Sequence, residues 1–218
     1  MKKPILTLAL ATGLITSAGN AKAQDLFVAN YNGNSIGQYD AKTGVSINSS
    51  LVTGVNRPGV IVLSGNNLFV ANDGGTTIGE YNAITGTAIN SSFITGLASP
   101  WGIAISANSL FAGSMYGNII GKYDATTGAA INSSFITGLS QPTGIAISGN
   151  NLFVANYGRG TIGEYDATTG AAINSSFITG LNGAVGLAVQ SVPEPSTYAL
   201  FGIGAIGMVI ALRRKKTA

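Results

Sequence analysis

Residues 26–44 read LFVANYNGNSIGQYDAKTG, and closely related segments begin at Leu68, Leu110 and Leu152. One 42-residue unit therefore occurs four times, without insertion or deletion between copies. Each copy continues with a stretch similar to AINSSFITGLxxPxGIAIS. A fixed period of this length is typical of repeat architectures, in which neighbouring units bury a shared core. The repeat therefore determines the architecture.

Four short apolar segments separated by turn residues fit into each unit. Taken from the copies that show them most clearly, the predicted strands are 68–71, 77–81, 131–137 and 102–106. This strand density is typical of one blade of a β-propeller. The last of these strands alternates Gly or Ala with β-branched residues, which suits a strand close to a crowded axis. We predict an all-β protein, a β-propeller of four 42-residue repeats.

The frame of the repeat bears on ring closure. The body opens with the second strand of a blade and closes with Gly186-Leu187-Ala188-Val189, an inner-strand sequence without the rest of its blade. This last strand can complete the first blade, which would join the two ends and remove the exposed sheet edges. We predict a closed four-bladed ring; the alternatives are an open arc and a larger ring completed by two chains.

The N-terminus has the pattern of a secretory signal peptide. A basic start at residues 1–3 and an apolar stretch at 4–18 precede Ala21-Lys22-Ala23, a small-x-small cleavage pattern before Gln24. We therefore expect signal peptidase to cleave after Ala23. The predicted domains are a signal peptide at 1–23, the repeat domain at 24–191, and a C-terminal sorting segment at 192–218.

Composition excludes several classes of function. The formal net charge is +3, but most basic residues lie at the two ends, and residues 24–192 hold four basic against seven acidic residues. Nucleic-acid binding needs clustered Lys and Arg, so we expect no nucleic-acid partner. The chain contains no Cys and no His, and His is the commonest general base and metal ligand. We predict no cofactor, no metal site and no catalytic residue.

The C-terminal segment has three parts in order. These are Val192-Pro193-Glu194-Pro195, an apolar run at 198–212, and the basic cluster Arg213-Arg214-Lys215-Lys216. A helix over 197–212 would span about 24 Å, close to a bilayer core of about 30 Å, and the flanking Arg and Lys can reach the interface. We predict a membrane helix with a cytoplasmic basic tail.

This arrangement resembles the PEP-CTERM sorting signal of exported bacterial proteins. The resemblance implies processing by an exosortase near Pro193-Glu194-Pro195, and a cell-surface, matrix or biofilm setting in a Gram-negative bacterium that makes exopolysaccharide. The blades resemble NHL-type propeller repeats over residues 26–189, which supports fold rather than function. A simple C-terminal anchor without processing is the alternative for the tail.

One set of loops differs most between copies and is the candidate ligand face. These loops follow the LFVAN-like strands, and a closed ring would present them together. Tyr and Trp rings stack on sugars, while amides and Arg bond hydroxyl groups. A purely structural role, with Gly and Asn making turns, is the alternative. The candidate residues are Asn30, Tyr31, Asn72, Asp73, Trp101, Tyr116, Asn156, Tyr157 and Arg159.

The sequence thus predicts an exported, noncatalytic surface or matrix propeller that binds exopolysaccharide or another protein, held by its C-terminal helix to the inner membrane during sorting. Two alternatives stay open. One is a propeller enzyme, a lyase or a lactonase-like hydrolase; the other is a structural spacer without a small ligand. Near-identical copies leave little room for the asymmetry of an active site, as residues 124–139 and 166–181 are the same sixteen residues.

Overall fold

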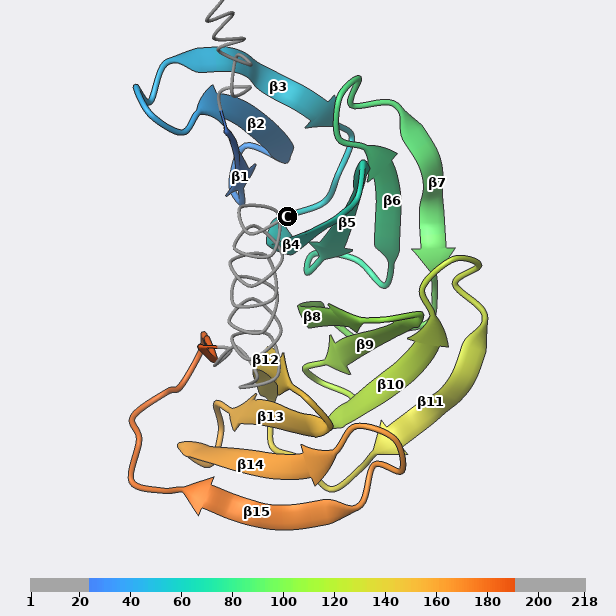
Figure 1. Cartoon of the computed structure of the whole chain (residues 1–218), viewed down its shortest axis with the longest axis vertical. Helices are drawn as coiled ribbons and strands as arrows, with labels where there is room; N and C mark the ends of the chain where they lie inside the picture. The colour runs from blue at the N-terminus through green and yellow to red at the C-terminus, as the bar shows by residue number, and fades with distance from the viewer. Residues whose placement is uncertain (1–23, 191–218) are drawn as a thin grey trace, which may run out of the picture.

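The computed structural model describes residues 24–190, which form fifteen β-strands in four antiparallel sheets (Figure 1). The first blade has three strands: β1 (Asp25–Asn30), β2 (Ser35–Asp40) and β3 (Ser46–Thr53). The second has four: β4 (Pro58–Ser64), β5 (Asn67–Asn72), β6 (Ile78–Asn82) and β7 (Ala88–Ile94). The third has β8 (Pro100–Ser106), β9 (Ser109–Ser114), β10 (Ile119–Asp124) and β11 (Ala130–Ile136). The fourth has β12 (Pro142–Ser148), β13 (Asn151–Asn156), β14 (Thr161–Asp166) and β15 (Ala172–Ile178).

The four blades follow one another around an axis in an arc (Figure 1). Within each complete blade the strands lie side by side in chain order, so each blade is an up-and-down meander. The inner strands β4, β8 and β12 lie next to one another near the axis, and β1 lies beside β4. The predicted strands and their order within the blade are therefore confirmed.

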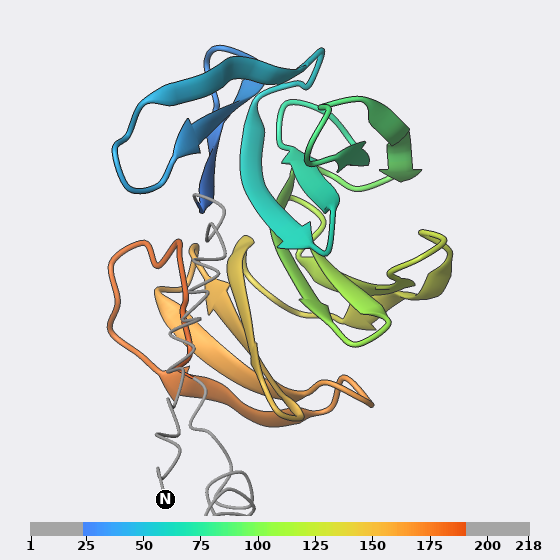
Figure 2. The same cartoon turned by 45° about the horizontal axis from the view of Figure 1, so that its top comes forward.

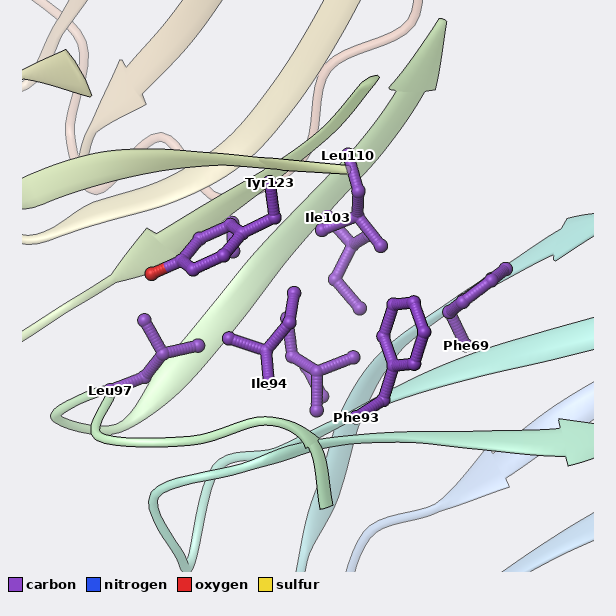
Figure 3. Packing of buried hydrophobic residues seen from close by; sticks show 10 residues of the cluster. Phe69, Phe93, Ile94, Leu97, Ile103, Leu110 and Tyr123 are labelled. Carbon is purple, nitrogen blue, oxygen red and sulfur yellow. The ribbon is translucent and has the colours of Figure 1, made fainter. Parts of the chain in front are cut away.

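Apolar clusters between consecutive blades form the core. Between the second and third blades, Phe69, Phe93 and Ile94 of one sheet pack against Leu110 and Tyr123 of the next (Figure 3). A matching cluster joins the third blade to the fourth, and another joins the first to the second. Equivalent residues of consecutive repeats therefore fill equivalent places in the core, as Phe69 and Phe93 do in one cluster and Phe111 and Phe135 do in the next. The tyrosines that occur once per repeat in these strands are part of the core: Tyr81, Tyr123 and Tyr165 are buried and belong to the three clusters.

The inner strands approach so closely that a side chain on one of them would clash. A Cβ at Gly102 in β8 would overlap the carbonyl oxygen of Thr143 in β12. Glycine is therefore required at this position by contact between two backbones, as the small residues of the repeat predicted.

The hairpin turns between the third and fourth strand positions combine a side-chain acceptor with a closing glycine. In the third blade, Asp124 Oδ1 accepts hydrogen bonds from the backbone amides of Thr126 and Thr127 at 2.9 and 2.8 Å, and Gly128 closes the turn with φ of +73°. The second copy has Asn82 in place of the Asp, and its Oδ1 accepts the two corresponding amide bonds at 2.9 Å. The turn therefore requires an acceptor oxygen but no charge.

We predict that these turns set part of the acid sensitivity of the fold. Hydrogen bonds from threonine hydroxyl and amide groups lower the pKa of Asp40, Asp124 and Asp166 in the folded state. An acid with a lowered folded pKa stabilises the fold above its unfolded pKa, near the ordinary value of 3.8, and this stabilisation is lost as the pH falls through the folded value. Replacing all three with Asn, as nature does at residue 82, should flatten the loss of stability below about pH 4. Urea unfolding at pH 7 and pH 3 measures it; equal acid sensitivity in both proteins would contradict it.

Ring closure by the last strand is not seen. Residues 186–189 form no strand and pair with no strand of the first blade, which therefore keeps three strands. The two ends of the arc carry apolar side chains that are buried at every internal position: Leu26 is 50% exposed, whereas its counterparts Leu68, Leu110 and Leu152 are at most 1% exposed. The structure thus shows four blades in an open arrangement.

The predicted signal peptide and C-terminal membrane helix lie outside residues 24–190. Within the described part of the chain, the structure contains no apolar helix of membrane-spanning length.

Candidate functional site

Side chains from three different blades converge around Trp101. Tyr31 follows β1, Asp73 follows β5, and Trp101 is the second residue of β8. The rings of Tyr31 and Trp101 lie with centroids 6.0 Å apart and tilted by 48°. Tyr31 Oη donates a hydrogen bond of 2.5 Å to Asp73 Oδ2, which lies one repeat of 42 residues later in the sequence. Residues that the sequence placed on a common face therefore do come together here.

A cation and a second hydroxyl complete this cluster. The Arg57 guanidinium lies over the Tyr31 ring, 4.7 Å from its centroid, and Ser99 Oγ donates a hydrogen bond to Asp73 Oδ1. The hydrogen bond to Asp73, followed by burial and the carboxylate charge, raises the pKa of the Tyr31 hydroxyl. Tyr31 therefore remains a neutral hydrogen-bond donor through the physiological range. We call Tyr31, Arg57, Asp73, Ser99 and Trp101 the aromatic cluster.

A cavity of about 250 Å³ adjoins the aromatic cluster. Trp101, Met115, Thr143, Tyr157 and Val185 line it, so Trp101 belongs to both features. The lining is mostly apolar, and Tyr157 is 45% exposed. Mostly apolar walls with a few hydroxyl groups are typical of sites that bind small molecules or sugar rings.

The three asparagines of the predicted face have structural bonds. Asn30 Oδ1 accepts from the backbone amide of Gly33 at 3.2 Å within its own turn. Asn72 and Asn156 are buried, and their Oδ1 atoms accept from the backbone amides of Asn56 and Ser140, both at 3.1 Å. The Asn72 and Asn156 side chains thus fix the loops that lead into the inner strands, which leaves the aromatic and charged residues as the candidates for ligand contact.

Two further residues of the predicted face lie away from the aromatic cluster. Tyr116 is 68% exposed and does not line the cavity beside Trp101. Arg159 donates through Nη1 to the carbonyl oxygen of Gly138 at 3.2 Å and lines a separate, more polar hollow with Asn156 and Ser176. The nine predicted residues therefore do not form one continuous surface.

Sequence reasoning missed five residues that the structure adds. Arg57, Ser99 and Thr143 lie at or just before the start of the inner strands, Val185 lies beyond β15, and Met115 is in a variable loop. Comparing Gly59, Trp101, Thr143 and Val185, which occupy the same position in successive copies, would have found part of this set. This position carries a different residue in every copy, whereas the positions on either side carry the same residue in three copies of four, which is the signal of a position with its own role.

The carboxylates of the hairpin turns lie apart from the aromatic cluster and bond their own turns. Among residues 24–190, no group of three or more acidic, His or Cys side chains is placed to hold a metal ion.

Known proteins match the two parts of the chain separately. Residues 191–215 match the PEP-CTERM protein-sorting motif. The PEP-CTERM match confirms the predicted sorting signal, and it implies an exported protein that an exosortase sorts through its C-terminal segment. No curated protein sequence matches the chain.

Solved structures match the blades. The computationally designed Ika8 protein superposes with a TM-score of 0.57 and 16% identity, over 77% of this chain and 50% of its own. The designed Ika4 protein gives a TM-score of 0.50 and 18% identity, over 66% of this chain and 89% of its own. A catalytically inactive virginiamycin B lyase from Staphylococcus aureus with quinupristin gives a TM-score of 0.61 and 17% identity, over 76% of this chain and 56% of its own. These similarities support the β-propeller fold, and the chain spans about half the length of Ika8 and of the lyase.

Proposed function

We propose that the protein is a noncatalytic propeller, displayed at the cell surface or in the extracellular matrix of a Gram-negative bacterium, that binds exopolysaccharide at the aromatic cluster. The observation that carries this proposal is the convergence of Tyr31 and Trp101 around Asp73. Two neighbouring aromatic rings, tilted by 48°, beside a carboxylate and hydroxyl groups can hold a sugar ring by its apolar face and bond its edge hydroxyls. The PEP-CTERM motif supports the setting, because it implies export.

The proposed lack of catalysis rests on how the polar groups are used. Asp73 accepts from both Tyr31 and Ser99, so its oxygens already have partners that a general base would need to give up. The chain supplies no His that could act in its place. We therefore assign Asp73 to positioning Tyr31. Release of unsaturated or shortened oligosaccharides from polysaccharide by the pure protein would contradict this assignment and favour a lyase or hydrolase.

Replacing Trp101 with Ala should weaken retention on polysaccharide at least about tenfold, the loss expected when a central aromatic contact of about 1.4 kcal/mol is removed. Trp101 is the residue shared by the aromatic cluster and the adjoining cavity. Affinity electrophoresis in gels that contain extracted exopolysaccharide measures the effect. Tyr116→Ala is the matched control, because it removes an exposed aromatic from a loop outside the cavity. Equal losses in the two variants would contradict a site at Trp101.

Replacing Pro193-Glu194-Pro195 with three alanines should separate sorting from anchoring. The apolar run and the basic cluster remain, so a simple anchor would behave as before. We expect the variant to accumulate in the inner membrane and to disappear from the cell surface and medium, as measured by fractionation and immunoblotting. Unchanged distribution would contradict processing at this motif, while leaving the proposed polysaccharide site untouched.

A further inference from the structure

The two ends of the arc expose the two halves of a blade-to-blade interface. At the leading end, Leu26 and Val28 of β1 are 50% and 41% exposed. At the trailing end, Phe177 and Ile178 of β15 are 48% and 44% exposed, whereas their counterparts Phe135 and Ile136 are 9% and 3% exposed. The same residue types pack against each other at the internal interfaces. Because both exposed faces repeat the residues of the internal interfaces, the two faces are complementary to each other.

A cavity marks the place where the missing half would fit. It has a volume of about 340 Å³ and an apolar lining that includes Phe153, Ile162, Phe177, Ile178 and Leu187. One repeat earlier, the corresponding residues Phe111, Ile120, Phe135, Ile136 and Ile145 enclose Leu152 and Val154 of the following blade. The counterparts of Leu152 and Val154 in the first blade are Leu26 and Val28.

The segment after β15 already follows the path that leads into a next blade. Leu181 donates its backbone amide to the carbonyl oxygen of Gly160 at 2.9 Å, as Leu139 does to Asn118 at 3.3 Å one repeat earlier. Gly183 has a positive φ of 68°, as has its counterpart Gln141 at 50°. The chain therefore leaves the fourth blade as it leaves the third.

Residues 184–187 occupy the position of an inner strand, but no further strands of a blade follow them in the described part of the chain. Val185 and Leu187 lie against Gly144 of β12 in the way that Thr143 and Ile145 of β12 lie against Gly102 of β8. Thr143 Oγ1 donates a hydrogen bond of 2.9 Å to the carbonyl oxygen of Ala184, which fixes the segment to β12. The segment thus lies where a fourth inner strand would follow β4, β8 and β12, although it forms no strand here, and the first blade is the one that lacks an inner strand.

We propose that two copies of this chain join head to tail into one closed ring of eight blades. The trailing face of each copy packs on the first blade of the other, and residues 187–189 add the missing inner strand to the other copy's β1. The register follows from the pairs Ile145 with Val154 and Ile147 with Leu152: shifted by one repeat, Leu187 pairs with Val28 and Val189 with Leu26. Two identical interfaces then leave no blade end exposed.

A second copy fits this role better than the first blade of the same chain. All interfaces between consecutive blades use nearly the same residues, so each interface sets nearly the same angle between two blades. With this angle, the first and fourth blades stand at opposite ends of the arc (Figures 1 and 2). The Ika8 and lyase chains are matched over only 50% and 56% of their length, so both continue beyond the arc. Closing the ring with four blades would require every interface to change its angle.

A cysteine pair tests the inference in the full-length chain, which contains no Cys of its own. Leu26→Cys and Val189→Cys are introduced together, and the protein is oxidised with copper-phenanthroline and run on a denaturing gel without reductant. Directly opposed residues of antiparallel strands lie within disulfide reach. We expect a covalent dimer that reductant returns to the monomer, and also a covalent dimer when each Cys is carried by a different copy.

Two matched variants check the register. Either Cys alone should give no dimer, because the two copies of that residue lie in different interfaces of the ring. Leu26→Cys with Val185→Cys should cross-link poorly, because residue 185 is four positions away from residue 189, the proposed partner of residue 26. A disulfide within one chain would overturn the inference in favour of a self-closed ring, and no disulfide would overturn it in favour of an open arc. Sedimentation of the unmodified chain in density-matched detergent is independent of cysteine placement: the mass of two chains is expected, and a single chain of 22.0 kDa overturns the inference.

Discussion

Phe111→Ala destabilises the fold by about 3–5 kcal/mol, the usual cost of removing a buried aromatic side chain. Phe111 is 1% exposed and lies between the third and fourth blades, where its ring packs on that of Phe135 with centroids 5.6 Å apart. The Lys122 ammonium, 5.4 Å from the ring centroid, loses part of its aromatic contact as well. Because the free energy of unfolding of a domain is typically about 5–15 kcal/mol, this single substitution removes a large part of the stability.

Ile131→Ala is the control for this loss. Ile131 lies in β11 of the same blade but is 57% exposed, and exposed substitutions usually change stability by about 0.5 kcal/mol or less. Urea unfolding followed by circular dichroism compares the two variants. Similar midpoints for Phe111→Ala and the unchanged protein would show that the interface between these blades contributes little to stability.

Gly102→Ala should cost about 3 kcal/mol or more, at or above the upper end of what overpacked cores lose. The added methyl group meets the carbonyl oxygen of Thr143, and a backbone atom cannot rotate away as a side chain does. Relief therefore requires β8 and β12 to move apart, which also loosens the two apolar clusters to which Ile103 and Ile145 belong. Loss of cooperative thermal unfolding is the expected observation.

Gly113→Ala is the matched substitution in the neighbouring strand β9. A Cβ there would have its nearest neighbours at an ordinary contact distance of 3.5 Å, and the other copies carry Ala29, Ala71 and Ala155 at this position. Because Gly is less favourable than Ala inside a strand, we expect this variant to gain up to about 1 kcal/mol. Equal stability of the two glycine variants would contradict close inner-strand packing as the reason for Gly102.

Most of the fold could be predicted from the repeat, because each of its four copies shows the same pattern of strands. The turn at Asp124, the close approach at Gly102 and the meander within each blade follow from residues that recur every 42 positions. Closure was harder to predict, because pairing of residues 187–189 depends on the angle between blades. That angle results from many small packing contacts, so no single residue in the sequence indicates it.

The candidate site was predictable only in part, for a related reason. Tyr31, Asp73 and Trp101 lie at positions where the copies differ from one another, so the sequence singles them out. Their contact across blades depends on where each loop starts relative to the axis. The asparagines illustrate the opposite case: Asn72 and Asn156 recur because they accept hydrogen bonds from the backbone of the loop that precedes the inner strand of their own blade, and their recurrence is a structural signal.

The fluorescence of Trp101 tests the proposed binding site most directly, because Trp101 is the single tryptophan of the chain. Titration of the purified full-length protein with exopolysaccharide extracted from the producing cells should change the intensity and wavelength of its emission in a saturable way. The same titration of Tyr116→Ala should give a similar curve. Polysaccharide that binds without any change in this emission, or that does not bind at all, would contradict a carbohydrate site at Trp101.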